Sequence, residues 1–111
     1  MELNKNDICL VDFNPAKGGE IGKLRPAIIM SQNDDNQMLS TVIVIPLSTH
    51  IEADALPYRL TLPKRDKLDK ISDACIYEIR ALSKTRIKDK IGSISEAEAQ
   101  IIQKSLCELI G

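Results

Sequence analysis

The chain has 111 residues, of which 43% are hydrophobic and 28% charged, and its formal net charge is -1. These values are typical of one globular domain over residues 1–111 with a single modest core. A net charge near zero argues against broad, sequence-independent nucleic-acid binding, but it is compatible with a local basic groove. Because only three residues are aromatic, the core is expected to be aliphatic, and stacking platforms made of several aromatic rings are excluded.

The N-terminal segment and the cysteines indicate a cytoplasmic protein. The opening residues MELNKNDICLVDF lack the basic and apolar regions of a signal peptide, and no apolar run is long enough to span a bilayer. Cys9, Cys75 and Cys107 are widely spaced and the chain has one histidine, so neither a disulfide framework nor a zinc site is expected. We therefore expect free, buried cysteines, no metal and no cofactor.

Short β-branched and apolar runs dominate the sequence up to about residue 82 and predict a series of strands. The expected strands cover residues 7–13, 27–31, 40–48, 56–62 and 74–82. Between them the sequence predicts a polar loop at 16–26, a turn rich in Asn and Asp at 32–37, and a charged, solvated turn or short hairpin at 63–74 to which we assign no chemistry.

Two details of this strand pattern bear on the expected surface. Pro46 lies near the end of the third run, so this stretch is expected at a sheet edge or bulge, with residues 47–49 emerging onto a rim. In the last run the alternation places Cys75, Tyr77 and Ile79 on one face. Short strands or a helical turn are expected for residues 83–94.

A C-terminal amphipathic helix is predicted from about residue 96 to 109. Ser95 followed by Glu98 is typical of a capping box. Apolar side chains then recur at helical spacing, at Ala99, Ile102, Leu106, Leu109 and Ile110. Several strands followed by one helix indicate a mainly β fold with α, namely a small, partly open β-barrel with a helix packed on it.

The glycine-rich loop before the second strand carries the first candidate chemistry. Its spacing does not fit a Walker A phosphate loop, because Gly18 lies too close to Gly22 and Lys23, and Leu24 follows the lysine. Glu20 and Arg25 provide a carboxylate and a permanently cationic guanidinium, which suit a phosphodiester site. The alternative is a surface ion pair that braces the loop.

Three segments together resemble the MazF/PemK toxins of bacterial toxin-antitoxin systems. DICLVDFNPAKGGEIGKLRPAIIMS is similar to the family's opening, in which an aspartate-led strand, a proline turn, a Gly-x-Glu loop and Arg-Pro precede a strand. VIVIPLST resembles the third strand, and YEIRALSKTRI resembles a later strand with the arginine that follows it. The resemblance covers nearly the whole chain and implies a small SH3-like barrel of the MazF/PemK/CcdB type.

The resemblance implies a metal-independent endoribonuclease that cuts single-stranded RNA, with the 2'-hydroxyl attacking the adjacent phosphate. It gives the central catalytic positions to Arg25 and Ser48, and a third position to Glu20. Arg25 is expected to bind the developing phosphorane, Ser48 to donate to a non-bridging oxygen or orient the attacking hydroxyl, and Glu20 to accept its proton. Residues expected to contact RNA are Gly18, Gly19, Lys23, Thr49, His50, Arg80 and Arg86.

Two of these assignments leave alternatives open. His50, two residues after Ser48, is either an acid or base near the site or an exposed loop histidine. The cations between residues 80 and 90 form either an RNA-facing stripe or a solvated hairpin face, with Arg80 bonded inside the fold.

The expected protein is thus the toxin of a type II system, an mRNA interferase that binds a cognate antitoxin and forms a homodimer. One alternative is a CcdB-like toxin that binds DNA gyrase and catalyses nothing, because that family shares the barrel. Another is a barrel that binds RNA or protein without cleaving it. Arg25 and Ser48 distinguish these possibilities, since a ribonuclease needs the pair and a gyrase poison does not.

Overall fold

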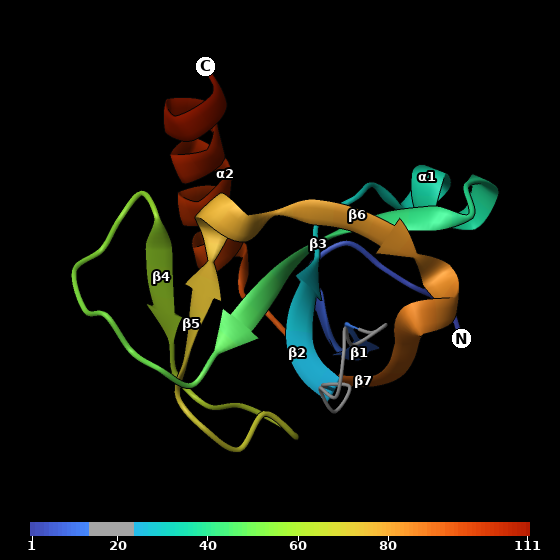
Figure 1. Cartoon of the computed structure of the whole chain (residues 1–111), viewed down its shortest axis with the longest axis horizontal. Helices are drawn as coiled ribbons and strands as arrows, with labels where there is room; N and C mark the ends of the chain where they lie inside the picture. The colour runs from blue at the N-terminus through green and yellow to red at the C-terminus, as the bar shows by residue number, and fades with distance from the viewer. Residues whose placement is uncertain (14–23) are drawn as a thin grey trace, which may run out of the picture.

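The structure is a computed structural model and describes residues 1–13 and 24–111 (Figure 1). Its strands are β1 (Asp7–Asp12), β2 (Leu24–Ile29), β3 (Thr41–Ser48), β4 (Arg59–Leu62), β5 (Ser72–Cys75), β6 (Arg80–Ser83) and β7 (Ile87–Ser93). The helices are α1 (Asn33–Met38) and α2 (Glu96–Ile110), and two single-turn 3-10 helices are η1 (Ile76–Glu78) and η2 (Lys84–Arg86).

The described strands form one curved, antiparallel, seven-stranded sheet. Its order is β4-β5-β3-β2-β1-β7, and β6 pairs with β3 beside this path. In the described part of the chain, no ladder joins β4 to β7, so the barrel is not closed. The long C-terminal helix α2 stands beside β4 and β5 (Figure 1). The expected mainly β fold, a partly open barrel with a C-terminal helix, is confirmed.

β3 changes partner along its length. Residues 41–44 pair with β6, whereas Leu47 and Ser48 pair with β5, and residues 44–46 pair with β2. Pro46 lies opposite Ala27 on β2. On its other side, the pairing with β6 has ended at Val44 and the pairing with β5 begins only at Leu47. The expectation of an edge or a bulge was wrong, because the interruption of the ladder on that side accommodates a proline within an interior strand.

Two apolar clusters occupy the two faces of the sheet. The period-2 alternation sends Ile8, Ile28 and Ile45 to the cluster under α2, and sends Cys9, Ala27 and Val44 to the cluster on the opposite face. Burial on both faces explains why these strands read as nearly continuous apolar runs. Leu47 belongs to the first cluster and is 2% exposed, so it does not lie on a rim as expected.

The C-terminal helix begins and packs as predicted. The Ser95 hydroxyl accepts the Glu98 N–H, and the Glu98 carboxylate accepts the Ser95 N–H, which completes the capping box. Ile102 is fully buried, and the first cluster is also packed by Ala99, Leu106 and Leu109. Ile110 is 74% exposed, so the apolar face does not extend to the last residue of the helix.

The segment predicted as a turn at 32–37 is instead helix α1. The Asn36 side chain of this helix is buried, and its Nδ2 donates to the carbonyl oxygens of Ser31 (3.0 Å) and Leu3 (3.4 Å). These contacts join the helix to residues distant in sequence, so tertiary hydrogen bonding overrides the local turn preference of Asn and Asp.

Other predicted boundaries also differ. β2 begins at Leu24 and therefore includes Arg25 and Pro26, which were expected in the preceding loop. The strand predicted at 74–82 is interrupted by η1, and this leaves Tyr77 70% exposed rather than on one face of a continuous strand. Cys9 and Cys75 are buried as expected, but Cys107 is exposed on α2.

Candidate functional site

The candidate site is a row of polar side chains that crosses adjacent strands. In the β3–β5 ladder Ser48 lies directly opposite Asp73, and in the β4–β5 ladder Thr61 lies opposite the same residue. Residues opposite each other in an antiparallel pair point to the same face of the sheet. Ser48, Asp73 and Thr61 therefore line one face, and their strand neighbours Leu47, Ala74 and Leu62 pack on the other face in the cluster under α2.

Arg25 lies at the same edge of the sheet. The described β2–β3 ladder ends at the pair Ala27 and Pro46. By the alternation of each strand, Arg25, two residues before Ala27, and Ser48, two residues after Pro46, belong to the same face as Ala27, although no described pair of this ladder joins them. Arg25 is exposed and Ser48 is half-buried, so this edge combines an accessible guanidinium with a hydroxyl.

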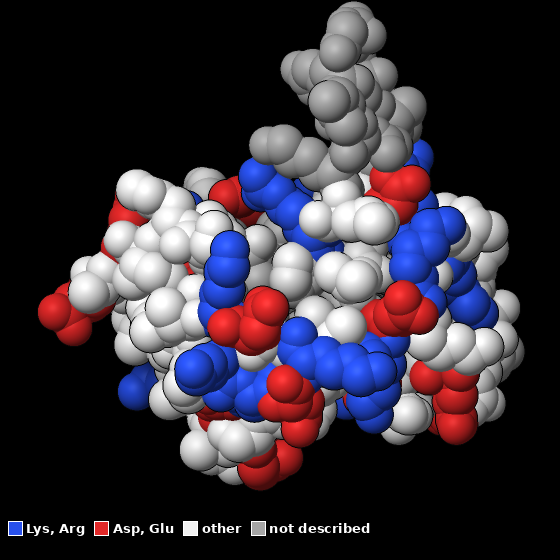
Figure 2. All heavy atoms as spheres, turned by 90° about the horizontal axis from the view of Figure 1, so that it is seen from below, with Lys and Arg blue, Asp and Glu red and all other residues white. Residues whose placement is uncertain are grey.

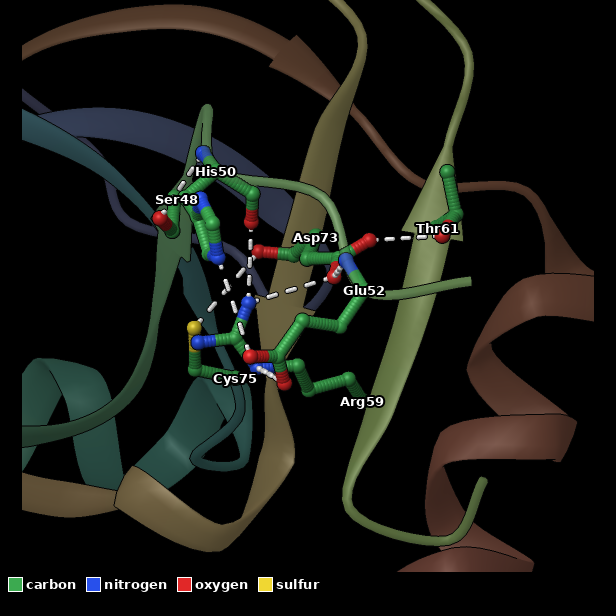
Figure 3. Close-up of polar contacts among 7 residues, drawn as sticks. All are labelled: Ser48, His50, Glu52, Arg59, Thr61, Asp73 and Cys75. Atoms are coloured by element: carbon green, nitrogen blue, oxygen red, sulfur yellow. Dashed lines mark hydrogen bonds and ion pairs between the residues drawn. The ribbon is translucent and has the colours of Figure 1, made fainter. Parts of the chain in front are cut away.

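The Ser48 hydroxyl has a defined hydrogen bond to the chain that follows it. Its Oγ accepts a hydrogen bond from the backbone N–H of His50 at 3.1 Å (Figure 3). This bond closes a local turn of the kind that serine side chains typically form. Because the oxygen acts as an acceptor in this bond, the hydroxyl hydrogen is free to be donated to a bound group.

Asp73 is the central acceptor of the site. Its carboxylate is fully buried and accepts three hydrogen bonds, from the Glu52 N–H (2.8 Å), Arg59 Nη1 (3.2 Å) and Thr61 Oγ1 (2.6 Å) (Figure 3). Burial by itself raises the pKa of Asp73, but the hydrogen bonds from these three donors outweigh it and hold the pKa below its usual value. Asp73 is therefore a charged acceptor at neutral pH.

Arg59 connects this carboxylate to the loop after β3. Its Nη1 also donates to the backbone carbonyl of His50 at 2.9 Å, and its Nε lies 3.5 Å from Glu52 Oε2. Burial lowers the pKa of Arg59, and the hydrogen bond to Asp73 and the neighbouring carboxylates raise it further than burial lowers it. The side chains of Arg59, Glu52 and His50 converge over Asp73 and Cys75 in Figure 3.

Sequence reasoning missed this network. Asp73 was assigned to a solvated turn, and Arg59 and Thr61 were placed on a strand without a role. One signal was available, because Asp73 is followed directly by the apolar run Ala-Cys-Ile, and an aspartate next to a buried strand needs partners.

The remaining predicted site residues fall into two groups. Thr49 and His50 are exposed and follow Ser48 directly, and His50 Nε2 lies 3.7 Å from Glu52 Oε1. The second group lies outside the described residues and consists of Gly18, Gly19, Glu20 and Lys23.

The cations between residues 80 and 90 do not form one continuous stripe. The Arg80 guanidinium lies over the ring of Phe13, 4.5 Å from its centroid, and Arg86 Nη1 donates to the Asp12 carbonyl at 3.2 Å. Lys90 lies 3.1 Å from Asp7. Figure 2 shows Lys and Arg interleaved with Asp and Glu on one face of the molecule. Arg80 pairs with Val44 on β3, the strand that also carries Ser48, and the alternation along β3 assigns both to one face.

Two tyrosines form an exposed aromatic pair near the start of β4. The rings of Tyr58 and Tyr77 are 5.9 Å apart in an edge-on arrangement, and the side chains are 53% and 70% exposed. The composition excluded a platform of several rings, yet the fold brings two of the three aromatic residues together at the surface.

The described residues contain neither a membrane-spanning helix nor a cluster of metal ligands. No described helix has both the length and the apolar composition required to cross a membrane. No three His, Cys, Asp or Glu side chains within residues 1–13 and 24–111 gather closely enough to hold a metal ion.

Solved toxin structures share this fold. A MazE-MazF structure (Form-III) from Deinococcus radiodurans matches with a TM-score of 0.82 at 18% identity, covering 100% of this chain and 98% of that chain. The Mycobacterium tuberculosis toxin MazF-mt6 matches with a TM-score of 0.76 at 15% identity, over 92% and 93%. An endoribonuclease in complex with its cognate antitoxin, from Mycobacterial species, matches with a TM-score of 0.73 at 19% identity, over 99% and 94%. At these identities the likeness establishes the fold class, a MazF-type barrel.

The sequence itself identifies the family. The model described as PemK-like, MazF-like toxin of type II toxin-antitoxin system matches residues 4–110. The chain belongs to this family of toxins, and the resemblance found in its three motifs is confirmed.

Proposed function

We propose that this toxin is an endoribonuclease that cleaves single-stranded RNA in the cytoplasm, at the face of the sheet that carries Arg25 and Ser48. The observation that supports the proposal is the register of the β2–β3 ladder, from which strand alternation assigns Arg25 on β2 and Ser48 on β3 to one face. Family membership supports the same activity, and one structural neighbour is described as an endoribonuclease.

The proposed reaction is a transesterification within the RNA. The 2'-oxygen forms a bond to the adjacent phosphorus and loses its proton, while the bond from phosphorus to the 5'-oxygen breaks and that oxygen gains a proton. The products are a 2',3'-cyclic phosphate and a 5'-hydroxyl. Arg25 stabilises the charge that develops on the non-bridging oxygens, and Ser48 donates its free hydroxyl hydrogen to the same group. Glu20 is proposed to accept the 2'-hydroxyl proton.

The test is cleavage of a defined single-stranded RNA by the purified protein in EDTA, because the proposal assigns no step to a metal ion. We expect wild type to produce fragments with cyclic phosphate ends, and Arg25→Ala to lose about 10²-fold to 10³-fold in rate. Lys104→Ala on α2 is the matched control and should cleave like wild type. Wild-type cleavage by Arg25→Ala would overturn the assignment of Arg25.

The proposed partners are a cognate antitoxin and a second copy of the chain. Two of the matched structures are described as MazE-MazF or as a toxin with its antitoxin. Sedimentation of the purified chain tests for the homodimer, and inhibition of RNA cleavage by the co-expressed antitoxin tests for that partner. A wild-type protein that cleaves no RNA would instead favour a CcdB-like toxin that binds gyrase, or a barrel that binds without cleaving.

A further inference from the structure

We propose that Asp73 and Arg59 are positioning residues for RNA cleavage, because together they clamp the backbone of residues 50–52 and so fix the orientation of the Ser48 hydroxyl. The inference rests on the proposed function. It adds two residues that act through Ser48 and are not proposed to contact the RNA. Both lie on strands other than the one that carries Ser48.

The clamp has two attachment points on the loop. The Asp73 carboxylate accepts the N–H of Glu52 at 2.8 Å, and Arg59 Nη1 donates to the carbonyl oxygen of His50 at 2.9 Å. The same Nη1 donates to Asp73 at 3.2 Å, so the two attachment points are joined through one ion pair. A backbone donor and a backbone acceptor two residues apart are thus held from β4 and β5.

The clamp reaches Ser48 through one residue, His50. The N–H of His50 donates to Ser48 Oγ at 3.1 Å, and the carbonyl of that same residue is the acceptor of Arg59. Holding the peptide on the carbonyl side of His50 therefore limits the rotation of the neighbouring peptide, across the His50 Cα, whose N–H orients the hydroxyl. A catalytic donor gains from this because a displacement of about 1 Å can cost about 10²-fold in rate.

The pairing of the strands does not account for a carboxylate at this position. Backbone ladders already join β5 to β3 and β4, and the neighbours of Asp73 on β5 are buried residues such as Ala74 and Cys75. A buried charge is costly unless it is paired, and an apolar side chain of similar volume avoids that cost. Of the three donors to Asp73, one belongs to the loop and a second also holds the loop, so the carboxylate acts mainly on loop geometry.

Asparagine provides the sharpest substitution. Asp73→Asn keeps the size of the side chain, but one carboxylate oxygen becomes an NH2 group that can only donate. Each oxygen of Asp73 now faces a donor, Thr61 on one side and both Glu52 and Arg59 on the other. An amide oxygen turned towards Glu52 and Arg59 can still accept from both, and the NH2 group can then donate to the Thr61 hydroxyl. The neutral oxygen is nevertheless a weaker acceptor than a carboxylate, so Asp73→Asn weakens the clamp without changing the side-chain volume.

The experiment measures kcat and KM for RNA cleavage together with amide hydrogen exchange at Glu52, in the full chain. For Asp73→Asn we expect kcat to fall by about tenfold to 10²-fold, KM to change by less than about threefold, and the Glu52 amide to exchange at least about tenfold faster. Arg59→Met, which keeps Asp73, should lower kcat in the same way and serves if Asp73→Asn does not fold. Asp34→Asn on α1 is the charge-matched control and should match wild type.

The outcomes separate the two proposals. If wild type cleaves RNA and the folded Asp73→Asn and Arg59→Met proteins retain its kcat, the positioning role is wrong and the proposed function stands. If wild type does not cleave, the proposed function fails. Unchanged exchange at Glu52 in Asp73→Asn would overturn the clamp whatever the activity.

Discussion

Ser48 and Asp73 are the last pair of the β3–β5 ladder, so a half-buried hydroxyl and a fully buried carboxylate face the same side of the sheet from adjacent strands. The loop that begins at Ser48 returns over Asp73 and donates to it through the Glu52 N–H. The chemistry proposed for the edge therefore depends on a charge that is inaccessible to solvent.

Two substitutions at Ser48 distinguish the role of its hydroxyl from that of the rest of the side chain. Ser48→Ala removes the donor, and we expect the rate of RNA cleavage to fall by about 10²-fold. Ser48→Thr keeps a hydroxyl on a β-branched side chain, and should retain most of the activity. Single-turnover cleavage of a defined RNA measures both variants, and a Ser48→Ala protein as fast as wild type would remove Ser48 from the proposed mechanism.

Thr61→Val tests the internal support of the buried carboxylate. The substitution removes the 2.6 Å hydrogen bond to Asp73 with little change in volume, so the free energy of unfolding should fall by about 1–3 kcal/mol. Urea denaturation gives this value. Thr41→Val, at an exposed position on β3, is the control and should change the free energy of unfolding by less than about 0.5 kcal/mol. Equal midpoints for the two variants would contradict the prediction.

Stability should fall on the acid side because of Asp73. Its pKa in the folded protein is below the unfolded value, so its contribution is complete above the unfolded pKa and is lost as the pH falls through the folded pKa. The pKa of Glu98 is also lowered, chiefly by its hydrogen bond from Arg65, and this adds to the loss of stability at acid pH. Denaturation midpoints between about pH 6 and pH 2 measure the slope, which should be shallower in Asp73→Asn than in wild type.

Arg65 links the segment after β4 to the start of α2. Its Nη1 and Nη2 pair with the two carboxylate oxygens of Glu98, and both side chains are largely buried. Arg65→Met and Glu98→Gln should each destabilise the fold, and the double variant should be less destabilised than the sum, by about 1 kcal/mol or more. Additive effects in this double-mutant cycle would show that the two side chains are not coupled.

The three cysteines should react in a definite order. Burial, and then the charge of Asp7, raises the pKa of Cys9 to about 11, which leaves about one thiolate in a thousand at pH 8. Burial also raises the pKa of Cys75, whereas Cys107 is exposed on α2. Iodoacetamide at pH 8 should therefore label Cys107 first, as read by peptide mass spectrometry, and rapid labelling of Cys9 in the folded protein would contradict the assigned burial.

Local signals explain which elements could be predicted from the sequence. The capping box of α2 lies within four residues, and the β-branched runs of β1 and β3 carry their own strand preference. Helix α1 escaped prediction because Asn36 is fixed by Leu3 and Ser31, and contacts of this kind have no trace in local composition.

The candidate site could also be predicted from the sequence only in part. Motif spacing pointed to Arg25 and Ser48, but only the register of β2 against β3 assigns them to one face. Asp73 lies in a segment rich in Lys and Asp, where a carboxylate is normally solvated, so sequence pattern favoured the wrong environment. Its burial follows from the loop after β3 folding back onto β5, which is a property of the tertiary structure.

The partner change along β3 limits where the chain tolerates changes in length. A one-residue insertion within Thr41–Ser48 would shift the side-chain alternation of β3 relative to β2 and relative to either β6 or β5. It would therefore turn Ser48 or Val44 to the opposite face of the sheet. The segments on either side of this strand end in turns or loops, and extra residues there leave all three ladders intact. Peptide tags or reporter insertions should therefore be accepted around residues 53–56 and rejected throughout β3.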